Sequence, residues 1–208
     1  MEDELFVIGE SSGETETAVY YHAPGESWVE MYPGNYGPWE IWGTSASDVW
    51  LVGQDFAAHF DGEQWHDLTH DDFDCAFLYD VAKDTSGKVW LVGKRSSDID
   101  LPFIAGYDGD SWEIAVKDDS GNPQCDWNGS CYHAFLHGIQ AFDDGTMVAV
   151  GTSAMFFHDG DRWWQIKEFY EDGSWHNIRY MGAKDVWGVS GQEFYMTSGD
   201  GIYRVGCQ

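Results

Sequence analysis

A recurring segment constrains the fold of this chain more than any other feature of its 208 residues. An apolar run that ends in glycine, and once in serine, returns at intervals of about forty residues, with one longer interval. The copies read LFVIG, VWLVG, VWLVG, MVAVG and VWGVS, and they end at Gly9, Gly53, Gly93, Gly151 and Ser190. A chain that repeats itself at this period folds as a series of similar small units, each packed on its neighbour.

Each copy continues in the same way. A glycine-containing turn and then usually a tryptophan follow the run, as in PGESW, DGEQW, DGDSW and DGDRW, with a weaker DGIY in the last copy. Another short strand precedes the run, because residues 76–87 align with residues 134–145 without a gap. Each unit therefore predicts four short strands rich in Val, Ile and aromatic residues, separated by Gly, Asp and Ser turns. About forty residues per four-stranded unit is typical of a β-propeller blade.

The predicted fold is all-β: a five-bladed β-propeller of four-stranded antiparallel blades, in a single domain over residues 1–208. The repeats cover roughly 1–35, 36–75, 76–133, 134–172 and 173–208. The first copy begins at its second strand. Its blade therefore lacks the inner strand, unless residues upstream of Met1 in a longer protein supply it.

The strand DVWLVG followed by HFDGEQW resembles the degenerate Asp-box and tectonin-like propeller repeats of bacterial secreted and surface proteins. Residues 185–204, DVWGVSGQEFYMTSGDGIYR, are especially similar to tectonin repeats. The resemblance covers nearly the whole chain and implies a propeller fold. Such families include lectins, glycosidases and protein-interaction modules, so the function has to be sought in particular residues.

The charge balance excludes one class of partner. The chain has 37 Asp and Glu against 10 Lys and Arg, a formal net charge of -27. Nucleic acid is not an expected partner, because phosphate binding needs clustered Lys and Arg. Membrane insertion is not expected either, since the sequence contains no apolar run long enough to cross a bilayer.

The cysteines indicate the compartment. Cys125 and Cys131 bracket a short loop, which favours a local disulfide over a metal knuckle. A second disulfide between Cys75 and Cys207 is a further possibility that the sequence leaves open. A loop disulfide favours an oxidising environment, so the protein is expected to be secreted or displayed on a cell surface, with its signal outside this chain.

Candidate ligand-binding residues are those that the repeat does not explain. Most tryptophans occupy repeated columns and are expected to pack blade on blade. The loops that enter each blade usually carry function, and they hold the surplus aromatic residues Tyr36, Trp39, Trp127 and Trp175. One aligned column contains Tyr79, His137 and His176 beside Trp39, which could line the mouth of a central channel or plug it by stacking. Aromatic rings beside acidic side chains suit a neutral or cationic ligand, such as a sugar.

A second hypothesis for the same loops is that they bind calcium. Carboxylates are the hard oxygen donors that calcium binds, and they gather at Asp71, Asp72, Asp74, Asp118 and Asp119. Neither stretch has EF-hand spacing, so solvated acidic loops are the alternative. No other cofactor is expected.

The sequence favours a non-enzymatic, lectin-like binding module whose partner is a glycan. One alternative is a protein-interaction scaffold that binds another surface protein with its acidic face. Another is a glycosidase with an acidic pair in the funnel, since two carboxylates across a sugar are what that reaction needs. A sialidase is disfavoured because holding the substrate carboxylate needs clustered arginines.

Overall fold

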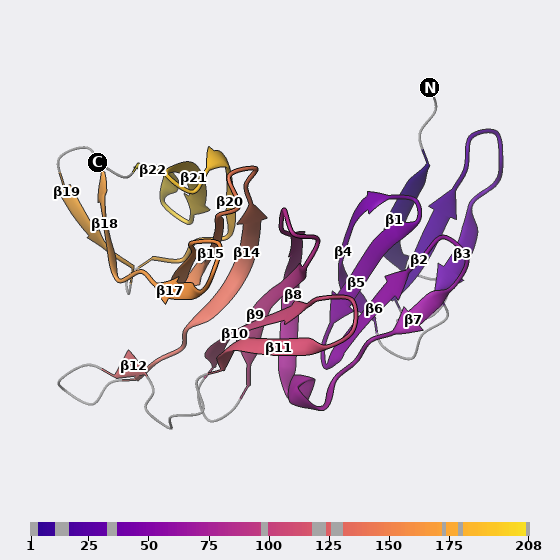
Figure 1. Cartoon of the computed structure of the whole chain (residues 1–208), viewed down its shortest axis with the longest axis horizontal. Coiled ribbons are helices and arrows are strands. Elements are labelled where there is room, and N and C mark those ends of the chain that lie inside the picture. Colours follow the sequence, from indigo (N-terminus) through magenta and orange to yellow (C-terminus); the bar gives the residue numbers. More distant parts are fainter. Residues whose placement is uncertain are drawn as a thin grey trace. The chain divides into compact units, whose positions relative to one another are not determined.

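The computed structural model describes residues 4–10, 17–32, 37–96, 100–117, 124–125, 131–171, 174–178 and 181–206. Over these ranges the chain forms β-strands and a short 3₁₀-helix, η1 (Asp71–Phe73), and no α-helix (Figure 1). They divide into two compact units, Met1–Leu78 and Tyr79–Gln208. The prediction of a single domain stays a prediction. No helix in the described ranges has the length and apolar character needed to cross a bilayer.

The first unit contains two antiparallel sheets that follow the first two sequence repeats. The first sheet has three strands in the order β1-β2-β3, with bounds Leu5–Glu10, Thr17–His22 and Val29–Tyr32. It starts at the second strand of the repeat, as predicted. The second sheet is a complete blade in the order β4-β5-β6-β7, with bounds Pro38–Ser45, Asp48–Gly53, Phe56–Phe60 and Trp65–Asp67.

The core of the first unit lies between these two sheets. Leu51, Phe56 and Val19 are almost completely buried, and Phe6 and Ile8 of β1 pack against them. Because successive side chains of a strand point to opposite faces, Leu5 and Val7 lie on the other face and are 50% and 43% exposed. The outer face of the first sheet is therefore apolar and uncovered within this unit.

The boundary between the units falls within the first strand of a four-stranded blade, and the second unit contains the rest of that blade, a second complete blade and three smaller sheets. The first blade has the order β11-β10-β9-β8, with bounds Ala76–Lys83 (β8), Val89–Arg95 (β9), Leu101–Tyr107 (β10) and Trp112–Lys117 (β11). The next has the order β14-β15-β16-β17, with bounds Phe135–Ala141, Met147–Thr152, Met155–His158 and Trp163–Gln165. A two-stranded hairpin, β12 (Gln124–Cys125) and β13 (Cys131–Tyr132), falls between them in the chain.

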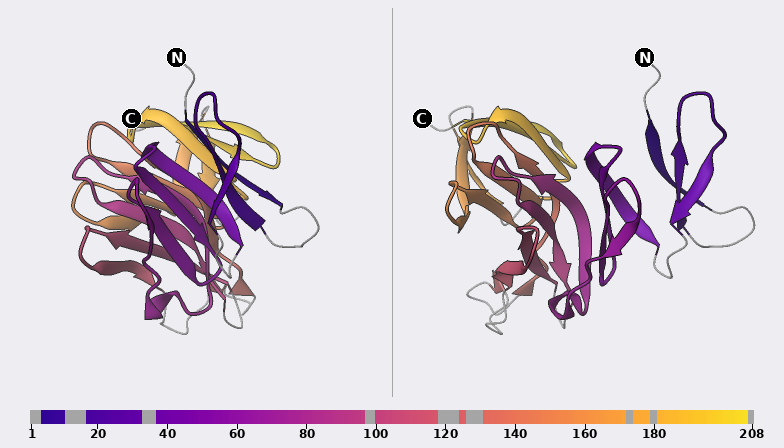
Figure 2. Two further views of the ribbon diagram at one scale, coloured as in Figure 1. Left: turned by 90° about the vertical axis from the view of Figure 1, so that its right-hand side faces the viewer. Right: turned by 45° about the vertical axis from the view of Figure 1, so that its right-hand side comes forward.

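These blades stack face to face. β14 contacts β9 and β10 on one side and β20 (Asp185–Ser190) on the other (Figure 2). The interface buries Trp90 and Met147, which share one column of the repeat. Burying one large apolar side chain contributes about 1.5–3 kcal/mol. The repeated column therefore forms the blade-to-blade interface, and the fold is an all-β one built from propeller blades.

The last repeat departs from the predicted pattern. Its sheet has three strands, β20, β21 (Glu193–Ser198) and β22 (Gly201–Gly206). The sequence predicts an inner strand within residues 173–184, but β19 (Ser174–Asn177) pairs instead with β18 (Glu168–Glu171). The two strands are only two residues apart in the chain, so this local hairpin closes a much shorter loop than a blade would require.

Two tryptophans of the repeated columns are also more exposed than their positions predict. Trp28 is 51% exposed and Trp187 is 40% exposed, whereas Trp50 and Trp90 are almost fully buried. Trp187 stacks on Tyr195 of the neighbouring strand within its own sheet, with ring centroids 5.7 Å apart. Trp187 lies in β20 and Trp28 immediately precedes β3, so both exposed rings are in or beside the three-stranded sheets, where the repeat is incomplete.

The aspartate of the repeated DG turn has a structural role. Oδ1 of Asp61 accepts hydrogen bonds from the backbone N–H groups of Glu63 and Gln64 at 2.8 and 2.9 Å. Asp108 and Asp159 make the same pair of bonds in their turns. The glycine after each aspartate has a φ near +100°, between +97° and +101°, a conformation that glycine adopts without steric cost. The recurring acid and glycine are thus explained by turn geometry.

Candidate functional site

Two residues of the predicted ligand column lie side by side in the second unit. Tyr79 of β8 and His137 of β14 have ring centroids 5.6 Å apart, with an interplanar angle of 37°. Phe135 lies edge-on to His137 at 4.8 Å. Both Tyr79 and His137 are half-buried, so each presents part of its ring to solvent. The inner strands of two stacked blades therefore build a small aromatic surface.

A β-bulge positions the imidazole. In the pairing of β14 with β15, Leu136 lies opposite Gly151 and Gly138 lies opposite Val150, so His137 is the extra residue. A bulge re-aims the inserted side chain and is common beside functional sites. The same irregularity occurs in the first unit, where Pro38 and Glu40 of β4 pair with Gly53 and Val52 and Trp39 is the extra residue. Trp39 is 44% exposed. Both bulged residues belong to the column of four that the sequence alignment identified.

A lysine completes the surroundings of His137. Nζ of Lys184, the residue before β20, donates a hydrogen bond to Nε2 of His137 at 3.2 Å. An ammonium can donate but not accept, so Nε2 must carry a lone pair and the imidazole is neutral, with its proton on Nδ1. The pKa of His137 agrees, because burial, Lys184 and Lys94 all lower it. Protonating His137 would bring a third positive charge beside two lysines.

A second lysine is fixed behind this pair. Nζ of Lys94 lies 3.0 Å from Oδ2 of Asp100, and both side chains are less than a fifth exposed. The same ammonium lies 5.5 Å above the ring of Phe135, within reach of a cation–π interaction. The backbone N–H of Asp100 donates to Nδ1 of His133 at 3.1 Å. Burial is the main reason that the pKa of Tyr79 is raised, and the nearby charge of Asp100 raises it further. The Tyr79 hydroxyl therefore stays protonated at neutral pH.

We refer to Tyr79, Lys94, Phe135, His137 and Lys184 as the His137 cluster. It offers two aromatic surfaces, a phenol, a neutral imidazole and an ammonium within one small region. Such a surface can stack against a flat ligand and donate hydrogen bonds to its oxygens. Sequence reasoning found Tyr79 and His137 but missed Lys94 and Lys184. The signal that points to the lysines is their rarity, since the chain has only 10 Lys and Arg in all.

The other predicted ligand residues lie elsewhere in the chain or outside the described residues. Trp39 lies in the first unit, where its ring is 5.5 Å from that of Phe77. His176 lies in β19 and packs edge-on against Tyr203 of β22 at 5.6 Å. Tyr36 and Trp127 fall outside the described residues, as does the side chain of Trp175.

The predicted calcium ligands show no coordination geometry in the part of the chain that the structure describes. Asp71 and Asp72 belong to η1, whose first turn is capped by His70, and Asp74 ends it. Nδ1 of His70 lies 3.5 Å from a carboxylate oxygen of Asp72. No group of three or more His, Cys, Asp or Glu among the described residues is arranged to hold a metal ion. Asp118 and Asp119 lie outside them.

The predicted disulfide also stays a prediction. Cys125 and Cys131 are register partners in the β12–β13 hairpin, but their side chains are outside the described set. Cys75 has a free, exposed thiol, and Cys207 is not described.

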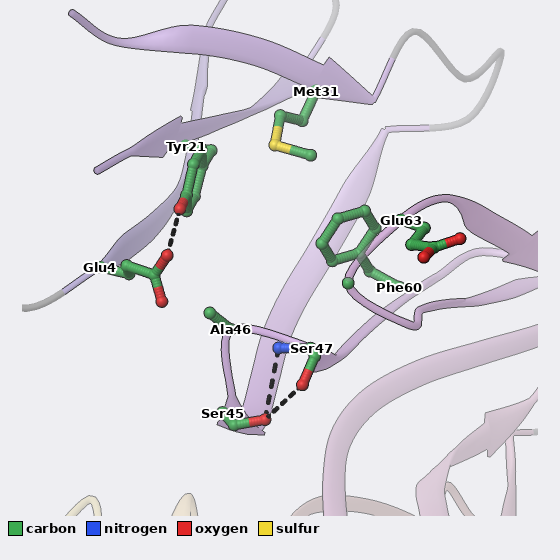
Figure 3. A pocket seen from close by; sticks show the side chains of 9 residues that line it. Glu4, Tyr21, Met31, Ser45, Ala46, Ser47, Phe60 and Glu63 are labelled. Carbon is green, nitrogen blue, oxygen red and sulfur yellow. Dashed lines mark hydrogen bonds between the residues drawn. The ribbon is translucent and has the colours of Figure 1, made fainter. Parts of the chain in front are cut away.

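The first unit contains a separate hollow of about 580 Å³ between its two sheets. Figure 3 shows Glu4 and Tyr21 on one side of it, with Phe60 and the turn at residues 45–47 opposite. The Tyr21 hydroxyl donates to a Glu4 oxygen at 2.5 Å. The turn joins β4 to β5, so the hollow opens at the end of the sheets away from the loops predicted to bind ligand. None of the predicted ligand residues lines it.

The chain matches no known family model and no curated protein in sequence. It is similar in fold to several solved structures. One is the extracellular domain of the putative one-component system BT4673 from B. thetaiotaomicron, with a TM-score of 0.62 and 10% identity, covering 97% of this chain and 26% of that one. Another is YCF48 bound to D1 peptide, with a TM-score of 0.54 and 13% identity, covering 92% of this chain and 58% of that one.

A third similar structure is virginiamycin B lyase from Staphylococcus aureus, with a TM-score of 0.58 and 9% identity, covering 92% of this chain and 59% of that one. The chain thus spans between about a quarter and three fifths of the length of these proteins. At such low identity the similarity supports the fold alone. The propeller fold is shared by binding proteins and by an enzyme, so it does not select a function.

Proposed function

We propose that this chain is a non-enzymatic binding module whose ligand binds at the His137 cluster. The observation that supports this most strongly is the convergence of Tyr79, His137 and Lys184 from three separate segments. Two half-buried rings beside hydrogen-bond donors form a recognition surface. The bulge in β14 makes His137 the extra residue of its strand and re-aims that side chain.

A carbohydrate is the ligand class that this surface fits best. The apolar face of a sugar stacks on an aromatic ring, and its hydroxyls accept from groups such as a phenol or an ammonium. Binding to an extracellular glycan also agrees with the acidic, cysteine-containing sequence.

A peptide is the second candidate. It is favoured because one of the propellers with a similar fold is bound to a peptide. An acid pair for glycoside hydrolysis has less support, because that chemistry needs two carboxylates flanking the bond. Asp100, an acid that contacts the His137 cluster, is held by Lys94.

A thermal-shift screen tests the proposal, because a ligand that binds only the folded state raises the melting temperature. The panel contains neutral sugars, acidic sugars and short peptides, and the variants are His137→Ala and Trp164→Ala. Trp164 is the control because it is an exposed aromatic residue on the outer strand β17, outside the His137 cluster. We expect at least a tenfold loss of affinity in His137→Ala and unchanged affinity in Trp164→Ala. Equal binding by both variants and the wild type would move the ligand to another surface.

A further inference from the structure

Positive charge is scarce in this protein, which makes its location informative. Acidic residues outnumber Lys and Arg by 37 to 10, yet two of the lysines meet at the His137 cluster. Placing two cations around one neutral imidazole costs free energy through repulsion. Such an arrangement is expected where an anion compensates it.

The two lysines differ in how they are neutralised. Lys94 is paired with Asp100 at 3.0 Å, and the Ser96 hydroxyl donates to the other oxygen of that carboxylate at 3.2 Å. Lys184 is exposed and donates to the neutral Nε2 of His137. Among the residues that the structure describes, no carboxylate lies within ion-pair distance of Lys184. An ammonium has three N–H donors, so Lys184 retains donors for a bound group.

The net charge of the protein limits which kind of ligand can carry the group that Lys184 binds. With a net charge of -27, the protein repels a ligand that carries many negative charges. A ligand with a single carboxylate on an otherwise neutral body meets Lys184 without much repulsion elsewhere. A sugar acid such as a uronate has this form, and its ring faces suit Tyr79 and His137.

We propose that the His137 cluster selects sugars that carry one carboxylate, and that Lys184 binds this carboxylate. The inference rests on the proposed function and specifies its ligand. Tyr79 and His137 contact the sugar ring, while Lys94, held by Asp100, adds positive potential behind it. A charge-assisted hydrogen bond from Lys184 supplies the preference for the acid over its neutral analogues.

The test compares glucuronate with glucuronamide, in which a neutral amide replaces the carboxylate, by calorimetric titration at low salt. Wild type should bind glucuronate at least tenfold more tightly than the amide. Lys184→Gln should abolish this preference, because it should weaken the binding of glucuronate at least tenfold more than that of the amide, and Lys184→Arg should retain the preference. Lys167→Gln is the matched control, because Lys167 is an exposed lysine in the connection before β18, outside the cluster.

A second readout verifies that Lys184 faces the imidazole in solution. The pKa of His137, followed by NMR of its ring protons, should rise in Lys184→Gln without ligand, because removing a nearby cation makes protonation easier. It should not change in Lys167→Gln. An unchanged His137 pKa in Lys184→Gln would overturn the geometry on which the inference depends.

The remaining outcomes separate the inference from the proposed function. Equal binding of glucuronate and glucuronamide, lost in His137→Ala, would overturn the inference and leave the binding module intact. Competition by inorganic phosphate or acetate as strong as that by glucuronate would reduce the site to a general anion site and overturn its selectivity for sugar acids. If only short peptides bind, the ligand of the site is a peptide and not a sugar, which overturns the inference. If no probe binds, the proposed function itself loses its support.

Discussion

At the scale of single residues, the repeated aspartates show why a chain this acidic contains acids that do not serve a ligand. Asp159 accepts two backbone hydrogen bonds at 3.0 Å and a third from Nε1 of Trp164 at 2.7 Å. The bond from Trp164 is the largest cause that lowers the pKa of Asp159 to about 2. The resemblance to Asp-box repeats is therefore centred on a turn that stabilises the blade.

Replacing this carboxylate tests its structural role. Asp159→Ala removes the acceptor for three donors, so the melting temperature at pH 7 should fall by roughly 2–4 °C, which for a chain of this size corresponds to a moderate loss. Differential scanning calorimetry measures it. Asp161→Ala is the control, because Asp161 lies in the same turn and contributes only its backbone N–H. An equal effect in both variants would show that the turn tolerates loss of the cap.

The difference in melting temperature between wild type and Asp159→Ala should depend on pH in a defined direction. A carboxylate whose pKa is lowered by folding stabilises the native state fully above its unfolded pKa of about 3.9. That contribution disappears as the pH falls toward the folded pKa of about 2. The melting temperatures of wild type and Asp159→Ala should therefore converge between about pH 4 and pH 2. A constant difference across this window would mean that the ionised form is not what stabilises the turn.

At the scale of elements, Gly151 and Gly53, which end two of the apolar runs, each pair with the strand segment that contains a bulge. A Cβ at Gly151 would lie 1.9 Å from the Phe135 carbonyl oxygen and 2.6 Å from Cα of Leu136. At Gly53 a Cβ would lie 2.9 Å from the carbonyl oxygen of Gly37. These neighbours are backbone atoms, which cannot move aside as a side chain can. In these two blades the glycine at the end of the apolar run thus lies where the first strand passes close to the second.

Gly151→Ala should for this reason destabilise the protein by about 1–3 kcal/mol or more, the usual cost of overpacking a tight interior. Urea unfolding followed by tryptophan fluorescence measures the change. Gly199→Ala is the matched control, since a Cβ there meets no atom within 4 Å. We also expect Gly151→Ala to alter the NMR signals of His137, because the bulge that holds this residue is opposite Gly151. Stability equal to that of Gly199→Ala would mean that the bulge relaxes without cost.

The repeat made the blades predictable, whereas the assembly of the site was much less so. Period, turn chemistry and strand composition depend on neighbouring residues, so β4 to β11 and β14 to β17 follow the sequence pattern closely. Alignment also placed Tyr79 over His137, and these rings do meet. Lys184 could not be assigned in advance, because its contact with His137 joins residues 47 positions apart. The predicted inner strand of the last blade instead forms a hairpin with β18, since local pairing competes with a pattern too weak to exclude it.

At the scale of the whole molecule, the net charge of -27 has a consequence for stability that no single contact carries. Like charges spread over a compact surface repel one another and destabilise the folded state. Among the residues that the structure describes, favourable pairs such as Lys94–Asp100 and Arg204–Glu193 are few, whereas the chain has 37 acidic residues. Repulsion should thus outweigh attraction in the electrostatic contribution to folding.

Salt should therefore stabilise this protein. The Debye length falls from about 30 Å at 0.01 M to about 3 Å at 1 M ionic strength, so added NaCl screens the repulsion and should raise the melting temperature by several degrees. Most of the rise should occur below about 0.2 M, where the Debye length drops beneath typical distances between surface charges.

A variant with Asp110→Asn, Asp143→Asn and Asp161→Asn removes three exposed charges whose side chains have no hydrogen bond or ion pair in the described structure. This variant should melt higher than wild type at low salt and respond less to NaCl. A melting temperature that falls with NaCl in both proteins would show that specific ion pairs, and not net repulsion, dominate the electrostatics of the fold.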